Sequence, residues 1–593
     1  MPTVILTGPP VPGSPLADEL VSLGFDVRPV TGPEDAAAAL ADVPADQRVA
    51  LVDSAFVGHV HALRLALTDP RFDACAVTGA LAVRGAARAA LDEAAALAPE
   101  ALGAGPYPDR LAAAVEGSGT TVQRPELGTL VAAVPAAGAE RESAVAAVAA
   151  VDDEAVRLRT AVKSRDGFFT TFFISPYSRY IARWCARRGL TPNQVTTASL
   201  ITALIAAGCA ATGDRWGYVA AGVLLLVSFV LDCTDGQLAR YSLQYSTMGA
   251  WLDATFDRAK EYSFYAGLAL GAARDGDDVW GLALGAMILM TCRHVVDFSF
   301  NEANHDATAN TSPTAALSGR LDSVGWTVWA RRMIILPIGE RWAMIAVLTA
   351  VTTPRIVFYA LLVGCAFGAL YTTAGRVLRS LTRKARRTDR AAQALRDLTD
   401  TGPLAELVAR IVSHPGHTLS LPFAVLGAAL VIGAACWAPF GAMTVVYAAL
   451  LYAVLSGGAV ARPLKGALDW LLPPLFRAAE YTTVLVLAWK ADVPGALPAA
   501  FGLVAAVAYH HYDTVYRIRG GSGAPPHWLV RMTGGHEGRV LLTAVLAAVL
   551  ARDAFPVALT AMAVFVALVV LVESIRFWVS SGAPAVHDEG EPA

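Results

Sequence analysis

Two hydrophobic patterns divide the chain. Residues 1–150 alternate short apolar runs, TVILTG, DVRPV and RVALVDSA, with alanine-rich stretches near 17–23 and 34–41. The runs are typical of strands and the stretches of helices. None reaches the roughly 18 to 20 apolar residues that a membrane-spanning helix needs. The pattern therefore predicts a soluble α/β domain at residues 1–150.

From residue 193 onward the apolar runs are long enough to cross a bilayer. The first set lies near 194–213, 216–240, 249–272, 278–300, 340–353 and 355–378. The second set lies near 420–438, 440–457, 468–490, 495–513, 536–551 and 554–578. We therefore predict an all-α polytopic membrane region of about twelve transmembrane helices in two six-helix sets.

Composition supports a membrane protein. The 593 residues are 55% hydrophobic and only 16% charged, whereas a soluble domain carries about 25% charge. The 47 basic and 50 acidic residues nearly cancel, so nothing indicates nucleic-acid binding, and lipid is the expected partner. The seven cysteines include no CxxC pair, which argues against a disulfide framework or a zinc site.

Charge also predicts orientation. The N-terminus has no basic segment before an apolar stretch, so it does not resemble a signal peptide, and we expect the first domain in the cytoplasm. The run RVLRSLTRKARRTDR after the sixth span is the densest positive cluster, which places it on the cytoplasmic side. Residues 177–188, YSRYIARWCARR, interleave arginine with a tryptophan just before the first apolar span, which favours an amphipathic interfacial helix over a solvated linker helix.

These features give a domain plan. It comprises the soluble domain at 1–150, a linker with the interfacial helix at 151–192, the first six-helix set at 193–385, a polar cytoplasmic connector at 386–418, the second six-helix set at 419–580 and a disordered tail at 581–593.

One motif carries chemistry. Residues 232 to 257 fit the pattern D-x2-D-G-x2-A-R-x8-G-x3-D-x3-D. Its fixed positions are Asp232, Asp235, Gly236, Ala239, Arg240, Gly249, Asp253 and Asp257. Each aspartate pair is spaced to lie on one helix face, and the polar stretch YSLQYST suits a turn between two antiparallel helices. We expect the four carboxylates to converge.

Four carboxylates at the ends of apolar helices require positive charge nearby. Oxygen ligands without histidine or cysteine favour Mg²⁺ or Mn²⁺, and four acids can hold two such ions. Gly236 would let a phosphate or ribose approach the backbone, Gly249 would let two helices pack closely, and Arg240 would supply a phosphate donor. Scattered polar contacts between helices are the alternative interpretation.

The eight motif positions resemble the signature of the CDP-alcohol phosphotransferase family of membrane enzymes, and TPNQVTTAS at 191–199 is similar to the start of that family's first span. The resemblance implies transfer of a phospho-alcohol group from a CDP-alcohol donor to an acceptor alcohol, with release of CMP, in phospholipid or glycophospholipid biosynthesis. It further implies that two copies of such a chain can pair.

The resemblance also implies roles for individual residues. Asp232, Asp235 and Asp253 would hold two metal ions, and Asp257 would be the general base while also touching a metal. The nucleotide and its diphosphate would be contacted by Gly236, Arg240, Ser246 and Thr196.

Polar residues further along are candidates for the acceptor pocket. Basic side chains there would suit a phosphorylated acceptor such as a sugar or polyol phosphate. The candidates are Arg258, Lys260, Glu261, Arg293, His294, Asp297, Arg331, Arg332 and Arg341. For the last three arginines, anchoring to lipid headgroups is an equally good interpretation.

The second apolar set resembles the first. TDGQLAR (234–240) aligns with SGGAVAR (456–462), and LDATFDRAKEY (252–262) with LLPPLFRAAEY (471–481). His294 and Asp297 are echoed by His510 and Asp513. The four aspartates become Val454, Gly457, Leu472 and Phe476. We therefore predict a degenerate repeat without a metal site. Such a half could bind lipid or product or replace the partner subunit of a homodimer, and no one role is assigned. A chance resemblance between alanine-rich helices is the alternative interpretation.

Two questions stay open. The linker before the first span resembles the junctions of relatives that carry an N-terminal cytidylyltransferase, but TGPPVPGSPLADEL lacks the arginine and lysine that a triphosphate needs. We predict a degenerate nucleotidyltransferase-like domain there. A duplicated transporter or a scaffold with a vestigial site is the alternative function, and the signature does not identify the donor or the acceptor.

Overall fold

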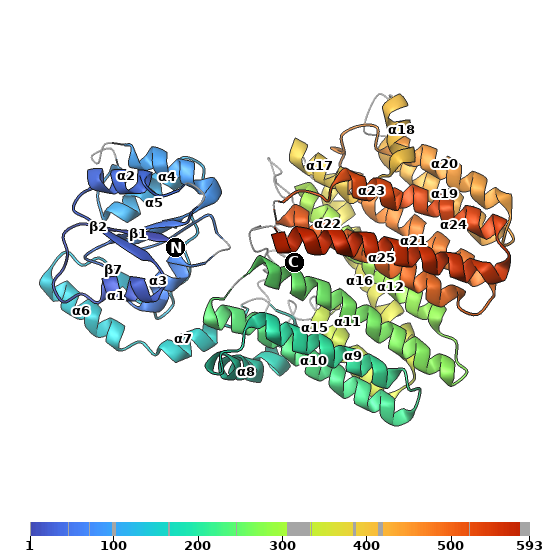
Figure 1. Cartoon of the computed structure of the whole chain (residues 1–593), viewed down its shortest axis with the longest axis horizontal. Helices are drawn as coiled ribbons and strands as arrows, with labels where there is room; N and C mark the ends of the chain where they lie inside the picture. The colour runs from blue at the N-terminus through green and yellow to red at the C-terminus, as the bar shows by residue number, and fades with distance from the viewer. Residues whose placement is uncertain are drawn as a thin grey trace.

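A computed structural model shows an α/β head and a larger helical part, joined by the segment from α6 to α8 (Figure 1). The structure describes residues 2–580 except 45–46, 70–71, 98–101, 164–165, 245, 305–332, 334, 383–386, 413–418 and 521. The predicted tail at 581–593 lies outside the described residues.

The head is built on a five-stranded sheet of order β2-β1-β3-β6-β5, in which β1 pairs parallel with β2 and β3 and the other pairs are antiparallel. The strands are β1 (Thr3–Thr7), β2 (Asp26–Val30), β3 (Val49–Asp53), β5 (Ala74–Val77) and β6 (Ala80–Val83). A two-stranded sheet pairs β4 (Val57–Gly58) with β7 (Ala132–Ala133).

Helices cover both faces of the head sheet. One face packs on α2 (Pro33–Ala41), α4 (Arg88–Ala95) and α5 (Tyr107–Gly117). The other face packs on α1 (Leu16–Ser22) and α3 (Val60–Leu67). Alternate strand residues face opposite sides, so Ile5 and Leu51 join the first core and Val4 and Val52 the second. The predicted α/β domain is confirmed.

The connection from the head begins with α6 (Gly138–Ala149), within the predicted first domain, and α7 (Asp153–Thr160), within the predicted linker. It ends in α8 (Ser175–Arg187), where the interfacial helix was expected. Tyr177, Tyr180 and Trp184 are exposed on α8, while Ser178 is buried and donates to Gln237 Oε1 at 2.7 Å. This two-sided helix matches the predicted amphipathic pattern.

A helix occupies each range predicted to span the membrane. The first set is α9 (Pro192–Ala210), α10 (Arg215–Ser242), α11 (Thr247–Arg274), α12 (Trp280–Asn304), α15 (Ile338–Val351) and α16 (Pro354–Thr382). The second set is α19 (Ser420–Trp437), α20 (Met443–Ala459), α21 (Leu472–Ala491), α22 (Ala496–Arg519), α24 (Gly535–Val549) and α25 (Phe555–Ser580). Within the described residues, seven helical stretches are long and apolar enough to cross a membrane, so the chain is an integral membrane protein, while the number twelve and the division into two sets stay predictions.

Glycines bring α11 against α9. A Cβ atom at Gly267 would lie 2.4 Å from the carbonyl oxygen of Ala207, and one at Gly271 would lie 2.0 Å from that of Ala210. Only residues without a side chain allow backbones to approach this closely. Because the motif aspartates Asp253 and Asp257 lie on α11, this contact fixes where they are held.

The two groups of helices pack through α12, which contacts α21 and α22. Aromatic pairs support this contact: Trp280 meets Phe501 edge to face at 5.6 Å, and Phe300 meets Trp470 at 5.3 Å. Between α16 and α19 lie α17 (Asp389–Leu398) and α18 (Pro403–Ile411). We call α9–α16 the first half and α17–α25 the second half.

Candidate active site

A tight turn joins the two helices of the aspartate motif, as the polar stretch predicted. Helix α10 ends at Leu243, whose φ of 52° lies in the left-handed region. Helix α11 begins after Ser246, whose hydroxyl accepts a hydrogen bond from the backbone N–H of Gly249 at 2.9 Å. Leu243 thus ends one helix and the capping serine starts the next, so both aspartate pairs reach the same end of the bundle.

The predicted carboxylates converge. Oxygens of Asp232, Asp235 and Asp253 all lie within 4.8 Å of one another. The carboxylates of Asp257 and Asp232 both contact the ammonium group of Lys260, so Asp257 lies beside this group. Asp235 is buried, Asp232 and Asp257 are half-buried, and Asp253 is exposed, so the group opens to the outside on the side of Asp253.

Lys260 lies against these carboxylates. The sequence had instead placed this lysine among the candidates for the acceptor pocket. Its ammonium group is 2.9 Å from Asp257 Oδ1 and also contacts Asp232, and the residue is 1% exposed. One buried cation thus neutralises part of the charge of four carboxylates. The remaining negative charge needs further cations.

The carboxylates fit a divalent ion on two observations. Asp235 Oδ2 is buried and has no hydrogen-bond partner among the described residues, which is costly unless a ligand satisfies it. The Lys260 ammonium group contacts both Asp232 and Asp257, so this one cation serves two of the four converging carboxylates. All the donors are oxygens, as Mg²⁺ and Mn²⁺ prefer.

The predicted nucleotide contacts surround these carboxylates. Thr196 is buried near the start of α9, where its hydroxyl donates to the carbonyl oxygen of Pro192 at 3.0 Å. A Cβ atom at Gly236 would lie 3.5 Å from the guanidinium of Arg240. Arg240 Nε donates to the carbonyl oxygen of Ala161 at 2.6 Å, so the linker to the head orients this arginine. Ser246 caps α11, and its predicted contact with the nucleotide stays untested.

Gly249 serves a different contact from the one expected. A Cβ atom there would lie 2.8 Å from Asn193 Oδ1 and 2.8 Å from Ser246 Oγ. The close approach is therefore to the start of α9 and to the turn itself.

A buried ion cluster follows the aspartates on α11. Arg258 Nη1 donates to Glu261 Oε2 at 2.8 Å, and Arg341 of α15 reaches the same carboxylate, with Nε 3.3 Å from Oε1. Arg341 is only 2% exposed, so it does not anchor the chain to lipid headgroups. The other two arginines of that prediction, Arg331 and Arg332, lie outside the described residues.

The acceptor candidates on α12 make separate contacts. Arg293 donates to the carbonyl oxygen of Ile335, and Asp297 pairs with Arg376 of α16. The ring nitrogen Nδ1 of His294 hydrogen-bonds the hydroxyl of Tyr512, which belongs to α22 of the second half. A residue that the sequence did not single out thus reaches the predicted acceptor side.

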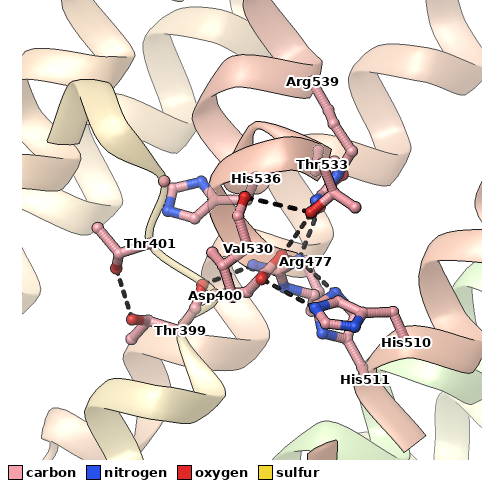
Figure 2. Close-up of polar contacts among 12 residues, drawn as sticks. Thr399, Asp400, Thr401, Arg477, His510, His511, Val530, Thr533, His536 and Arg539 are labelled. Carbon is pink, nitrogen blue, oxygen red and sulfur yellow. Dashed lines mark hydrogen bonds and ion pairs between the residues drawn. The ribbon is translucent and has the colours of Figure 1, made fainter. Parts of the chain in front are cut away.

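The second half contains an equivalent cluster, shown in Figure 2. Arg477 Nη1 donates to Glu480 Oε2 at 2.8 Å, the same distance as between Arg258 and Glu261, and Arg539 of α24 also holds Glu480. Here a further carboxylate, Asp400, accepts from Arg539 Nη2 at 2.6 Å and from His510 Nε2 at 3.1 Å. The repeated contacts support the predicted duplication.

The resemblance extends to the segments before the six-helix set of each half. Glu340 accepts a hydrogen bond from the backbone N–H of Phe169 at 3.3 Å, just before α8. Glu537 accepts from the N–H of Gly402 at 3.0 Å and from that of Ala405 at 3.1 Å, at the start of α18. In both halves, a glutamate near the start of the fifth helix of the six-helix set, α15 or α24, binds the backbone of the segment before that set.

Asp400, His510 and His511 are residue types that ligate metals and lie close together, yet their surroundings disfavour a cation. Arg477 Nη1 contacts His511, and Arg539 binds Asp400. Two arginines balance Asp400 and Glu480, so a divalent ion would add buried charge without compensation. The prediction that the second half lacks a metal site is consistent with this balance.

The Asp400 carboxylate is held ionised. Burial alone would raise its pKa, but the charge of Arg539 and the hydrogen bond from His510 outweigh burial and hold the pKa well below its usual range. Asp400 lies in the loop between α17 and α18 with a φ of 52°, a conformation that costs free energy for a residue other than glycine. The ion pairs hold that loop in place.

Residues 189–369 match the family described as CDP-alcohol phosphatidyltransferase, and residues 389–593 match a family of unknown function, DUF5941. An archaetidylinositol phosphate synthase of Pyrococcus horikoshii is 32% identical over 113 residues, 19% of this chain and 58% of that protein. A phosphatidylinositol phosphate synthase of Mycolicibacterium smegmatis is 35% identical over 123 residues, 20% of this chain and 53% of that protein.

A bifunctional IPC transferase and DIPP synthase of Aquifex aeolicus is 31% identical over 114 residues, 19% of this chain and 26% of that protein. The match thus spans less than two thirds of each of these relatives. The motif, the converging carboxylates and the family match all fall in the same helices. Residues 189–369 are therefore a domain of the CDP-alcohol phosphatidyltransferase family.

Proposed function

We propose that this protein transfers a phospho-alcohol group from a CDP-alcohol to an acceptor alcohol at the cytoplasmic face of a membrane, with release of CMP, in phospholipid or glycophospholipid biosynthesis. The convergence of Asp232, Asp235 and Asp253 beside Asp257 carries this proposal. Groups of carboxylates with an unpartnered oxygen suit the binding of a diphosphate together with divalent ions.

The reaction exchanges one P–O bond for another. The acceptor oxygen attacks the phosphorus that bears the donor alcohol, the bond from that phosphorus to CMP breaks, and the hydroxyl proton passes to the Asp257 carboxylate. Arg240 lies beside Gly236, where its guanidinium would bind the diphosphate and the departing CMP. Thr196 and Ser246 would contact the nucleotide.

Asp232, Asp235, Asp253 and Asp257 would hold Mg²⁺ or Mn²⁺. When bound, such ions neutralise charge on the phosphate oxygens as the bond to CMP breaks.

The acceptor we propose is a phosphorylated polyol. The names of the relatives describe inositol phosphate lipids. In this chain Arg258 and Arg341 are buried next to Glu261, and the half-buried His294 of α12 is joined to Arg258 through Tyr512. A cluster with two arginines and one glutamate carries net positive charge, which complements a phosphate.

A substrate panel tests the function. Purified full-length protein in detergent with Mg²⁺ should release CMP from a lipid-linked CDP-alcohol only when the right acceptor alcohol is added. The panel crosses CDP-diacylglycerol and soluble CDP-alcohols with inositol phosphate, glycerol phosphate, other polyol phosphates and diacylglycerol. Failure of every pair to release CMP would contradict the proposal and favour the transporter or scaffold alternative.

Lys260 offers a test of the metal site that does not depend on turnover. In a Lys260→Met variant, Asp232 and Asp257 lose the cation that neutralises them. We expect its melting temperature in EDTA to fall several degrees below that of the wild type and to recover with Mg²⁺, because bound cations stabilise the folded state. Differential scanning fluorimetry measures both conditions.

Lys490→Met is the matched control, because Lys490 binds the backbone carbonyls of Cys436 and Ala438 at the end of α21. Its melting temperature should show no added dependence on Mg²⁺. An equal Mg²⁺ effect in both variants would contradict a divalent site beside Lys260.

The head and the second half have proposed roles that support the reaction indirectly. We propose that the head is a degenerate nucleotidyltransferase-like domain, because the loop after β1 lacks the basic residues that a triphosphate needs. The second half packs on α12, where it would replace the partner subunit of a homodimer.

A further inference from the structure

We infer that the second half supplies a positioning residue to the active site of the first: the Tyr512 hydroxyl orients Arg258 and His294 for an anionic acceptor. This inference rests on the proposed function, since it concerns the acceptor of that reaction. Tyr512 lies on α22, in the segment matched to the family of unknown function. The family match at 189–369 does not include it.

Tyr512 lies between the two residues it would orient. Arg258 Nη1 is 3.4 Å from the Tyr512 hydroxyl, and the guanidinium carbon lies 4.9 Å from the centre of the ring. The hydroxyl also contacts His294 Nδ1. Because arginine can only donate, the phenol oxygen accepts from Arg258 and its own proton suits donation to Nδ1. That arrangement places the histidine proton on Nε2, where it can donate to a ligand.

The equivalent cluster of the second half contains a bound carboxylate. Arg477, Arg539 and His510, the counterparts of Arg258, Arg341 and His294, all hold the Asp400 carboxylate (Figure 2). Asp400 lies in the loop between α17 and α18, before the six-helix set of that half. The second half thus carries its own anion in the middle of the cluster.

The first half differs at this point. Two carboxylates, Asp400 and Glu480, serve the two arginines of the second cluster. In the part of the chain that the structure describes, Glu261 alone hydrogen-bonds both Arg258 and Arg341. The first cluster therefore has one positive charge in excess and a neutral hydroxyl, Tyr512, as the hydrogen-bond partner of its histidine. A phosphate on the acceptor would supply the missing negative charge.

The position of Tyr512 is fixed by its own neighbours. Phe298 packs against its ring edge to face at 6.0 Å, and the residue is buried. A rigid aromatic side chain with one polar atom is suited to hold two flexible groups in place. The second half would thereby set acceptor binding without contributing a metal ligand.

The test is a Tyr512→Phe variant of the full-length protein, which keeps the ring and removes the hydroxyl. With the acceptor found by the panel, its KM should rise about five- to tenfold, with the KM of the CDP-alcohol unchanged and kcat within about twofold. Calorimetry with inorganic phosphate in EDTA should show a weakening of similar size. If Tyr512→Phe does not fold, Phe298→Leu loosens the same ring, and about a threefold rise is expected.

Tyr452→Phe is the control, since Tyr452 is a buried tyrosine whose hydroxyl contacts His536 within the second half at 2.7 Å. It should leave both KM values unchanged. The inference is overturned if Tyr512→Phe leaves acceptor KM and phosphate affinity unchanged, raises both KM values equally, or behaves as Tyr452→Phe does. A wild type that releases no CMP refutes the proposed function instead, and phosphate calorimetry still decides the role of Tyr512.

Discussion

An Asp235→Asn variant should lose CMP release by about a thousandfold or more. Asp235 is buried, and its Oδ2 atom has no hydrogen-bond partner among the described residues. Its charge is thus available to a cation, and an amide supplies neither that charge nor a second acceptor oxygen. Loss of one charged ligand from a site that stabilises a transition state typically costs at least two to three orders of magnitude.

Two measurements check this expectation. One is CMP release with the substrates from the panel, and the other is Mn²⁺ binding by electron paramagnetic resonance, which needs no turnover. Asp214→Asn is the control on the same helix: Asp214 caps the start of α10 by accepting from Gly217 N at 2.8 Å, and asparagine caps equally well. An Asp235→Asn protein with full activity and normal Mn²⁺ binding would refute the site.

Asp400→Asn should destabilise the fold by about 3 to 5 kcal/mol without removing the catalytic carboxylates. The change leaves Arg477 and Arg539 with Glu480 as their remaining carboxylate in the cluster. Breaking a buried charge pair on one side leaves an uncompensated charge, which is the main cost. Unfolding in a series of denaturant concentrations in detergent measures the loss.

The pH dependence of this loss has a defined sign. Because the folded protein holds the pKa of Asp400 well below its usual range, its stabilising effect is complete above about pH 4 and disappears as the pH falls further. The difference between wild type and Asp400→Asn should shrink below that pH. For comparison, Asp389→Asn breaks the exposed pair with Lys465 and should cost under about 1 kcal/mol. A similar small loss in both variants would contradict the role of Asp400.

The sequence predicted the parts of the structure that local patterns determine. The spacing of the aspartates fixed their helix faces, and the polar stretch marked the turn that Leu243 and Ser246 form. The strands and helices of the head followed from alternating and periodic apolar residues. These features depend on residues within a few turns of one another.

Contacts over long distances along the chain were not predictable in the same way. Asp400 looks like part of a polar connector in the sequence, and only the fold brings it to Arg539. Tyr512 lies in an apolar helix and reaches Arg258 because two groups of helices pack together. Lys260 was assigned to the acceptor side because its position along α11 does not reveal which neighbouring helix it faces.

The glycine contacts between α9 and α11 have a consequence for the catalytic end of the molecule. Gly267 and Gly271 lie toward the opposite end of α11 from Asp253, roughly 21 and 27 Å away at the rise of an α-helix. Even a methyl group added at either glycine would push α11 away from α9. The position of the aspartates would thus depend on a helix contact in the opposite leaflet of the membrane from the reaction.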